Sequence, residues 1–171
     1  MILKPTSAQH PDWASVYIDK TPDGEVLAQL EKGVISILDY IENLTDEQLL
    51  YRYAEGKWTI KEVIVHLMDV ERVFSYRGLT TARRDTTSIP GFDHNAYVPN
   101  SAANQRDKES LIKEYKSLRE ATLQLFSNMS DEALDFIGEA KGQPCTAKAM
   151  VYMIAGHEQH HLQILNERYK Q

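Results

Sequence analysis

Residues 57–83, KWTIKEVIVHLMDVERVFSYRGLTTAR, carry both the period and the start signal of an α-helix. Apolar residues recur at steps of three and four, namely Ile60, Val63, Ile64, Leu67, Val70 and Phe74. Residues at these steps share one helix face, so the stretch predicts an amphipathic helix. Thr59 followed three residues later by Glu62 predicts a capping box, and the helix should begin near Trp58 or Thr59.

Three other segments repeat this helical pattern. The first covers about residues 24–44, with Pro22 just before it. The second runs from Leu111 to Met129, and the third covers residues 146–170. Four helices of roughly twenty residues, each about 30 Å long, predict an all-α four-helix bundle.

The segments between the helices differ in kind. Residues 85–106, DTTSIPGFDHNAYVPNSAANQR, contain two prolines, a glycine and many small polar residues, which break the helical period. They predict a long crossover rather than a hairpin, and their aromatic and acidic content argues against disorder. Residues 130–137 predict a short helical turn and residues 138–145 a loop. The sequence shows no strand signal and no internal repeat.

Composition limits the function classes. A chain of 171 residues with 42% hydrophobic content supports one sizeable core, so we expect a single domain over residues 1–171. A net charge of −6 without a dense Lys/Arg cluster argues against nucleic acid and anionic membranes as partners. The sequence has no run of eighteen apolar residues and no signal-peptide pattern, so we expect a cytoplasmic protein. The lone Cys145 rules out an intramolecular disulfide.

Residues 156–165, GHEQHHLQIL, are the strongest indication of a functional site. His157 and His161 are four residues apart and therefore lie one turn apart on the same helix face, where they can bind one metal ion. His66, on the inward edge of the helix at residues 57–83, is the predicted third ligand. Three protein ligands would leave positions open for water, a thiol or a substrate, which is typical of catalytic sites.

The same spacing also fits core histidines that form hydrogen bonds with neighbours, and such a pair occurs by chance. Three buried imidazoles without a shared ligand would leave ring nitrogens unpaired at about 1–3 kcal/mol each, which favours the metal site. His160 points about 60° away from His157 around the helix and should flank the site. Cys145 lies about 18 Å before His157 along a helix and is not an expected ligand. His10 and His94 lie in loops where histidines are usually solvated, although His94 could reach the site from the crossover.

Four segments together resemble the DinB-like superfamily, in its YfiT-type subgroup. They are YAEGKWTIKEVIVHLMDVERVFSYRGL, PGFDHNAYV, SLREATLQLF and MIAGHEQHHLQILNERY, in this order over almost the whole chain. The resemblance implies an up-down-down-up four-helix bundle, often a homodimer, with a long crossover between helices two and three. It also implies a site for a divalent metal such as zinc or nickel, with His66, His157 and His161 as its ligands.

The resemblance further implies a metal-dependent enzyme, most concretely an S-transferase that joins a small thiol such as bacillithiol to an electrophilic small molecule. A metal-dependent hydrolase is one alternative, and a non-enzymatic, metal-stabilised binding or dimerisation module is another. An open metal centre can lower the pKa of a bound thiol or of water. A hydrolase also needs a base near that water, and the candidates are Glu62, Glu158 and Asp93.

A thiol reaction needs a pocket for the polar body of the thiol rather than a carboxylate base. The candidate lining residues are Asp93, His94 and Tyr97 on the crossover, together with His160 and Arg77. Structural roles are the alternatives for several of these side chains. Tyr97 could anchor the crossover to the bundle, and Arg77 and Arg119 could tie helices together through carboxylates. We expect Trp58 to serve packing.

Overall fold

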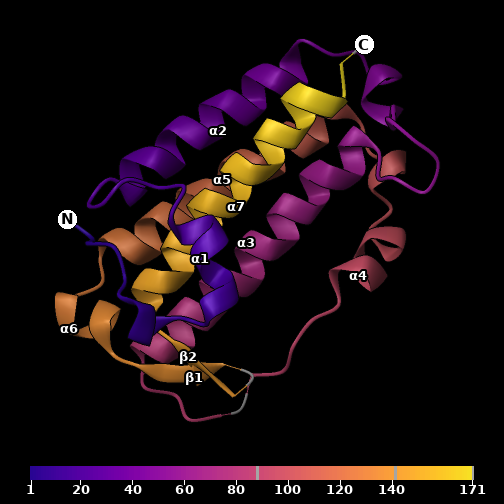
Figure 1. The fold of residues 1–171 in the computed structure, drawn as a ribbon. Coiled ribbons are helices and arrows are strands. Elements are labelled where there is room, and N and C mark those ends of the chain that lie inside the picture. Colours follow the sequence, from indigo (N-terminus) through magenta and orange to yellow (C-terminus); the bar gives the residue numbers. More distant parts are fainter. Residues whose placement is uncertain (88, 141, 171) are drawn as a thin grey trace.

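The computed structural model describes residues 1–87, 89–140 and 142–170. Its four long helices are α2 (Val26–Glu42), α3 (Ile60–Ala82), α5 (Lys108–Ser127) and α7 (Ala147–Arg168). Helices α2 and α7 run in one direction and α3 and α5 in the other (Figure 1). This is the up-down-down-up order, so the predicted four-helix bundle is confirmed. Among the described helices, none offers the apolar length that a bilayer crossing requires.

The four long helices form a closed ring of neighbours. Helix α7 packs on α2 and α3, and α5 packs on the same two helices from the other side. Lys108, at the start of α5, donates a hydrogen bond to the carbonyl of Leu44, just past the end of α2, at 2.9 Å. Thr59, before α3, donates to Asn104, before α5, at 2.6 Å. Helices α3 and α5 therefore start at the same end of the bundle and run in parallel.

The starts of the long helices follow from side-chain caps. The side chain of Thr59 accepts from the backbone N–H of Glu62, and the Glu62 carboxylate accepts from the N–H of Thr59 at 2.7 Å. The predicted capping box is therefore confirmed. At α5 and α7 a single N-cap side chain, Asp107 or Thr146, accepts from the backbone N–H three residues on, which satisfies a donor that would otherwise lack a partner.

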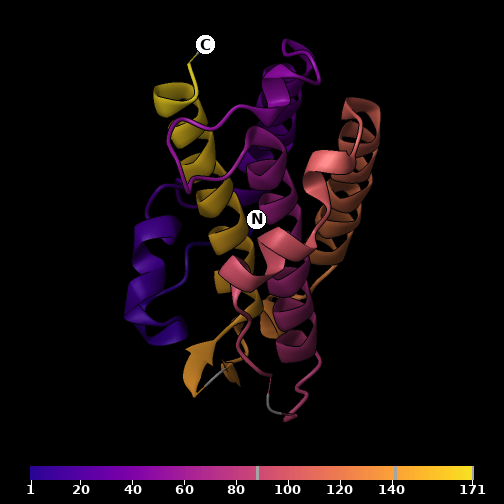
Figure 2. The ribbon, with the colours of Figure 1, turned by 90° about the vertical axis from the view of Figure 1, so that its right-hand side faces the viewer.

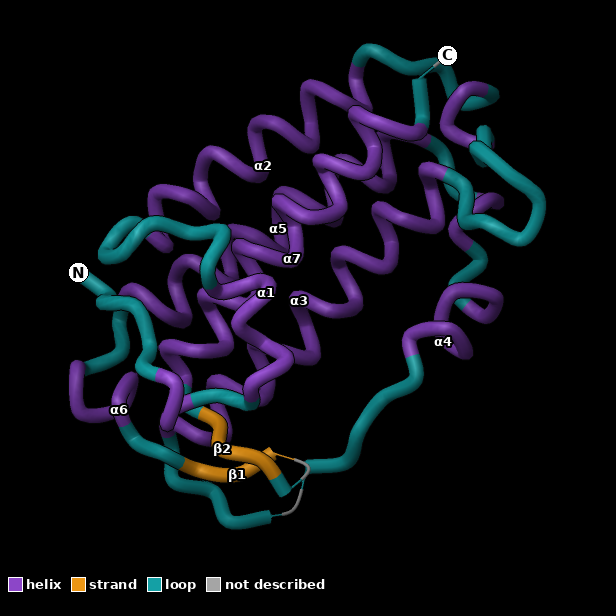
Figure 3. The backbone as a smooth tube through the Cα atoms, in the orientation of Figure 1, coloured by secondary structure: helices purple, strands orange, loops and turns teal. Residues whose placement is uncertain are grey.

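The structure corrects the sequence prediction in two of the connecting segments. The crossover contains a short helix, α4 (His94–Asn100), although the sequence suggested no regular element there. Helix α6 (Asp131–Asp135) matches the expected helical turn. The following segment is not the expected loop: β1 (Gly138–Ala140) and β2 (Gln143–Cys145) pair antiparallel near the end of α3 (Figure 3). The expectation of no strand was wrong, because pairs this short carry little alternation for a sequence to display.

The N-terminal segment forms a further small helix that the sequence did not indicate. Helix α1 (Ser15–Ile18) packs against α7 and lies on one flank of the bundle, with α4 on the other (Figure 2). A Cβ atom on Gly156 of α7 would lie 1.9 Å from the carbonyl oxygen of Tyr17. The glycine therefore allows the backbone of α1 to rest directly on α7.

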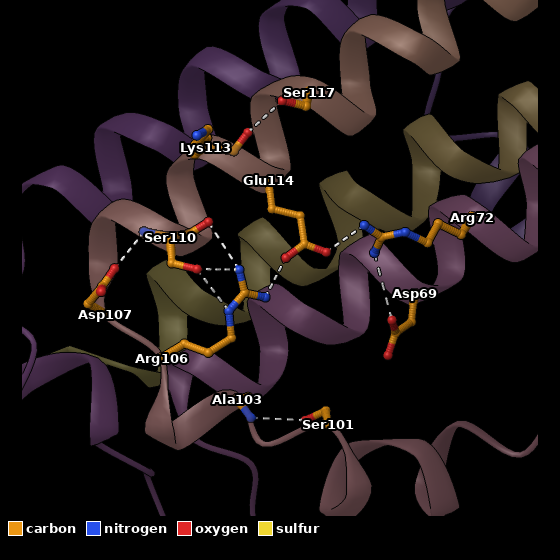
Figure 4. A network of polar contacts seen from close by, with 10 residues as sticks. All are labelled: Asp69, Arg72, Ser101, Ala103, Arg106, Asp107, Ser110, Lys113, Glu114 and Ser117. Carbon is orange, nitrogen blue, oxygen red and sulfur yellow. Dashed lines mark hydrogen bonds and ion pairs between the residues drawn. The ribbon is translucent and has the colours of Figure 1, made fainter.

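The far end of the crossover is fixed to the bundle by an ion-pair network (Figure 4). Glu114 on α5 lies between the guanidinium groups of Arg72 on α3 and Arg106 on the crossover, at 2.5 Å from each. Arg106 also donates to the carbonyl oxygen of Ser110 at 3.0 Å. Burial alone would raise the pKa of Glu114, but the two arginines outweigh it and lower that pKa. The crossover thus has a defined exit onto α5.

A polar layer divides the core into two apolar clusters. One cluster surrounds Leu30, Phe74, Phe126 and Met150, and the other surrounds Ile37, Ile64, Leu111 and Leu165. Between them, each long helix contributes one residue of the layer: Gly33, Glu71, Arg119 and Glu158. Arg119 binds both Glu71 oxygens at 2.9 and 3.0 Å and a Glu158 oxygen at 2.5 Å. As the sequence suggested, Arg119 ties the helices together through carboxylates.

Candidate metal centre

The structure brings the three predicted ligands together. His66 extends from α3, and His157 and His161 extend from successive turns of α7. The Nε2 atom of His157 lies 3.2 Å from that of His66 and 3.1 Å from that of His161. One ring nitrogen from each histidine lies within 4.8 Å of the others.

This convergence fits a metal ion better than a hydrogen-bonded cluster. A neutral imidazole nitrogen carries either one proton or one lone pair, so the Nε2 of His157 cannot satisfy both of its neighbours. Zinc binds imidazole nitrogen at about 2.0–2.1 Å, which separates two tetrahedral ligands by about 3.3 Å. The observed nitrogen separations are close to that value. The donor set therefore suits a divalent cation.

Burial keeps these imidazoles in the neutral form that binds metal. His66 and His157 are buried, and His161 is half-buried. Burial, together with the neighbouring imidazoles, lowers the pKa of His66 to about 3 and that of His161 to about 4. The pKa of His157 lies well below its usual value for the same reasons. At neutral pH no proton competes for the three nitrogens.

Aromatic rings from other elements hold the imidazoles in place. The Trp58 ring lies 4.8 Å from that of His66, and the Tyr17 ring meets His157 edge-on at 5.4 Å. His94 on α4 lies 5.6 Å from His66. Trp58 was expected to serve packing, and its ring packs on His66 at the border of the site.

A pocket of about 460 Å³ adjoins the triad. Its wall comes from the N-terminal segment that includes α1, the crossover, α3 with the residues just before it, and α7. The lining residues are Trp13, Tyr17, Trp58, His66, Val70, Phe74, Arg77, Gly91, Phe92, His94, His157, His160 and His161. Its position fits Figure 2, in which α1 and α4 flank the face formed by α3 and α7. This size is typical of small-molecule sites.

The pocket contains three of the five predicted lining residues. Arg77, His94 and His160 border it. Asp93 instead caps α4, where its carboxylate accepts from the backbone N–H of Asn95 at 2.9 Å. Tyr97 is 45% exposed and packs on Phe92 at 5.5 Å between ring centroids, a contact within the crossover that does not tie it to the bundle.

The candidate carboxylate bases have other tasks in the structure. Glu62 completes the capping box of α3, and Asp93 caps α4. Glu158 lies in the polar layer, held by Arg119 and by the hydroxyl of Tyr115 at 2.5 Å. Glu158 follows His157 directly along α7 but faces a different cluster.

Cys145 has no part in the triad. It ends β2, is buried, and accepts a hydrogen bond from the hydroxyl of Thr81 at 3.5 Å. Burial raises the pKa of its thiol, so the group is neutral at neutral pH.

The aromatic wall of the pocket was the part of the site that sequence reasoning missed. Trp13 and Tyr17 come from the N-terminal segment, and Phe74 and Phe92 come from α3 and the crossover. Trp13 and Tyr17 are four residues apart, a spacing that places two rings on one face of a helical segment. That spacing was the sequence signal from which this part of the aromatic wall could have been predicted.

Comparison with sequence families identifies the lineage of this fold. The family described as the DinB superfamily matches residues 29–165, which is most of the chain. The chain belongs to the DinB superfamily. The resemblance noted from the sequence segments is thereby confirmed.

Known proteins resemble this chain in sequence or in fold. A protein of Oceanobacillus iheyensis, described as a candidate metal-dependent hydrolase, is 29% identical over 141 residues, covering 81% of this chain and 80% of its own. The structure of YfiT from Bacillus subtilis, described as a candidate metal-dependent hydrolase with an unusual four-helix bundle topology, matches with a TM-score of 0.75 and 19% identity. That match covers 96% of this chain and 90% of YfiT.

A mycothiol-dependent maleylpyruvate isomerase has the same fold. Its structure matches with a TM-score of 0.69 and 13% identity, over 85% of this chain. The match covers 61% of the isomerase, so that protein contains a substantial part with no counterpart here. At these identities, both structural matches speak for the fold.

Proposed function

We propose that this DinB-superfamily chain is a metal-dependent enzyme that transfers a small thiol to an electrophilic small molecule. The observation that carries the proposal is the convergence of three Nε2 atoms beside a pocket of about 460 Å³. When bound, a divalent ion supplies a Lewis acid that lowers the pKa of a thiol at its open position. Three imidazole donors suit zinc or nickel.

The residues of the chain provide binding, orientation and exclusion of water. His66, His157 and His161 hold the ion, and the rings of Tyr17 and Trp58 restrict the imidazoles. Phe74 and Phe92 add apolar wall on which the electrophile packs. Holding both reactants in this enclosure replaces a random encounter with an oriented one. In the reaction, sulfur bonds to the electrophilic carbon, the leaving group departs, and the thiol proton goes to solvent.

The positions of the carboxylates favour thiol transfer over hydrolysis. Glu62 and Asp93 cap helices, and Glu158 is held by Arg119. A thiol reaction needs no carboxylate base, because the Lewis acid itself favours the thiolate. The dependence of the isomerase on mycothiol, stated in its description, supports a thiol as co-substrate in this fold.

Metal-dependent hydrolysis is the second candidate. The proteins of Oceanobacillus iheyensis and Bacillus subtilis are both described as candidate hydrolases. His94 and His160 border the pocket and are the side chains that could accept a proton from water. A purely structural role for the metal fits less well, because the triad adjoins a pocket of substrate size. A cytoplasmic homodimer remains the expected form of the protein.

The test is conjugation of bacillithiol, and of other small thiols, to a model alkylating agent. We expect a rate above background with zinc- or nickel-loaded protein, and loss of that rate after chelation and in His161→Ala. A His10→Gln variant serves as the matched control and should keep the rate, because His10 belongs neither to the triad nor to the pocket lining and its Nδ1 contacts the carbonyl oxygen of Pro11. Metal-dependent cleavage of an ester or amide panel without any thiol, combined with no thiol conjugation, would replace the transferase with the hydrolase.

A further inference from the structure

Arg77 is a buried cation in the pocket, and the described part of the chain offers it few acceptors. Its side chain is 8% exposed. The guanidinium has five N–H donors, and its polar partner within the described residues is the carbonyl oxygen of Pro90, 3.3 Å from Nη2. Its Nε has no hydrogen-bond partner there. Burial lowers the pKa of Arg77, but an arginine remains charged at neutral pH.

The contrast with the other buried arginine shows how unusual this arrangement is. Arg119 binds two carboxylates and the carbonyl of Leu30, and its three nitrogens all donate. A buried charge normally has such a partner, because removal from water is costly. Arg77 lies among apolar rings instead, with the Phe74 and Phe92 centroids each 5.8 Å from its Cζ. An anion that enters the pocket would supply the partner that Arg77 lacks among the described residues.

The position of Arg77 relative to the triad indicates the shape of that anion. Arg77 follows His66 by eleven residues, which is about three helical turns or about 16 Å along α3 and returns nearly to the same face. Side chains lean toward the start of their helix, so Arg77 reaches back toward His66. Val70 and Phe74 line the pocket between them. A ligand that touches both ends has an anionic group, an apolar middle and a reacting group several atoms away.

We propose that Arg77 binds a carboxylate of the substrate and that the site acts on carboxylate-bearing molecules with an apolar body. A carboxylate matches the planar fork of a guanidinium, and its binding would supply the acceptors that Arg77 lacks. The inference rests on the proposed function, because it names the substrate class of the same site.

The test is calorimetric binding of ω-phenylalkanoates, from phenylacetate to 6-phenylhexanoate, and of the corresponding neutral amides to zinc-loaded protein. We expect at least one acid to bind about tenfold more tightly than its amide, the factor expected of a hydrogen-bonded charge pair. Arg77→Gln should abolish this preference. Arg77→Lys should retain part of it, because the charge remains and the fork is lost. Arg83→Gln removes an exposed guanidinium at the end of the same helix and should leave the preference unchanged.

A repeat on zinc-free protein separates Arg77 from the metal as the carboxylate acceptor. The proposal expects an Arg77-dependent acid preference in both forms. It is overturned if no acid binds better than its amide, if Arg77→Gln keeps the preference, or if the preference needs zinc and ignores Arg77. The readout is binding, so the two proposals can fail separately. An acid preference without any metal-dependent turnover would refute the proposed enzymatic function and support the carboxylate site at Arg77. Metal-dependent turnover without the acid preference would support the enzymatic function and refute the carboxylate site.

A stability measurement guards against a structural role for Arg77. An unpartnered buried charge does not stabilise the fold, so Arg77→Gln should melt at or above the temperature of the wild-type protein. A lower melting temperature together with an unchanged acid preference would assign Arg77 to the scaffold and overturn the proposal.

Discussion

Two adjacent residues on α7, His157 and Glu158, face two buried polar clusters of opposite character. Glu158 belongs to the polar layer, where Arg119 and Tyr115 satisfy its carboxylate. His157 faces the pocket, where the polar atoms next to its Nε2, among the described residues, are the Nε2 atoms of His66 and His161. Among the described residues, the charged groups of the polar layer find their partners within the protein. The pocket contains polar groups that do not.

This difference separates groups that serve the fold from groups that serve a ligand. Folded proteins satisfy nearly all of their buried polar atoms, so a cluster left short of partners requires an explanation. The polar layer has its partners and serves the fold. Gly33 leaves room for Glu158, because a Cβ atom at Gly33 would lie 1.5 Å from the Oε1 atom of Glu158. In the pocket, a metal would bind the ring nitrogens of the triad, and an anion would accept hydrogen bonds from Arg77.

Removing Arg119 should have the largest effect on stability, because it breaks the complete cluster. Arg119→Met would leave Glu71 and Glu158 buried without their cation, at a cost of about 3–5 kcal/mol in the free energy of unfolding. Urea denaturation measures this loss. The control is Arg84→Met, which removes an exposed ion pair with Glu132 and should cost less than about 1 kcal/mol. Equal losses in the two variants would show that the polar layer does not hold the helices together.

Metal removal should have the next largest effect, because it acts on the incomplete cluster. An ion that binds the native chain alone stabilises it by about 4 kcal/mol when free metal exceeds its Kd a thousandfold. Chelation should therefore lower the melting temperature of the wild-type protein and leave that of His157→Ala nearly unchanged. A wild-type melting curve that ignores both chelator and added zinc or nickel would contradict a metal site at the triad.

Displacing α1 should have a smaller effect, confined to the pocket wall. In Gly156→Ala the new methyl group would meet the carbonyl of Tyr17, so α1 must move, at a cost of about 1–3 kcal/mol. Trypsin cleavage after Lys20, just beyond α1, should become faster. Gln159→Ala, a change on the same helix, should alter stability by less than about 0.5 kcal/mol. Unchanged stability and cleavage in Gly156→Ala would show that the contact between α1 and α7 does not define the wall.

Local sequence signals were sufficient for the main helices and for the histidine pair on α7. The apolar period marks α2, α3, α5 and α7, and the capping box at Thr59 sets the start of α3. The histidine pair depends only on helical spacing within α7. Each of these features involves residues within a turn or two of one another, so the sequence displays them directly.

The features that escaped prediction depend on tertiary contacts. Helix α1 is four residues long and rests on α7 through the close approach at Gly156. The strands β1 and β2 have three residues each, too few to show alternation. The aromatic wall and the isolation of Arg77 arise where the N-terminal segment, the crossover and α3 meet. No short stretch of the sequence contains residues from all three of these segments.

Metal stoichiometry tests the central claim most directly, because it asks whether the incomplete cluster binds an ion. Elemental analysis of untagged protein, after incubation with zinc or nickel and removal of excess ion, should find about one ion per chain in the wild-type protein and in His160→Ala. The variants His66→Ala, His157→Ala and His161→Ala should each lack a tightly bound ion, because two imidazoles are too few to hold it. Loss of the ion in His160→Ala with retention in His157→Ala, or a wild-type protein that binds neither metal, would contradict the account.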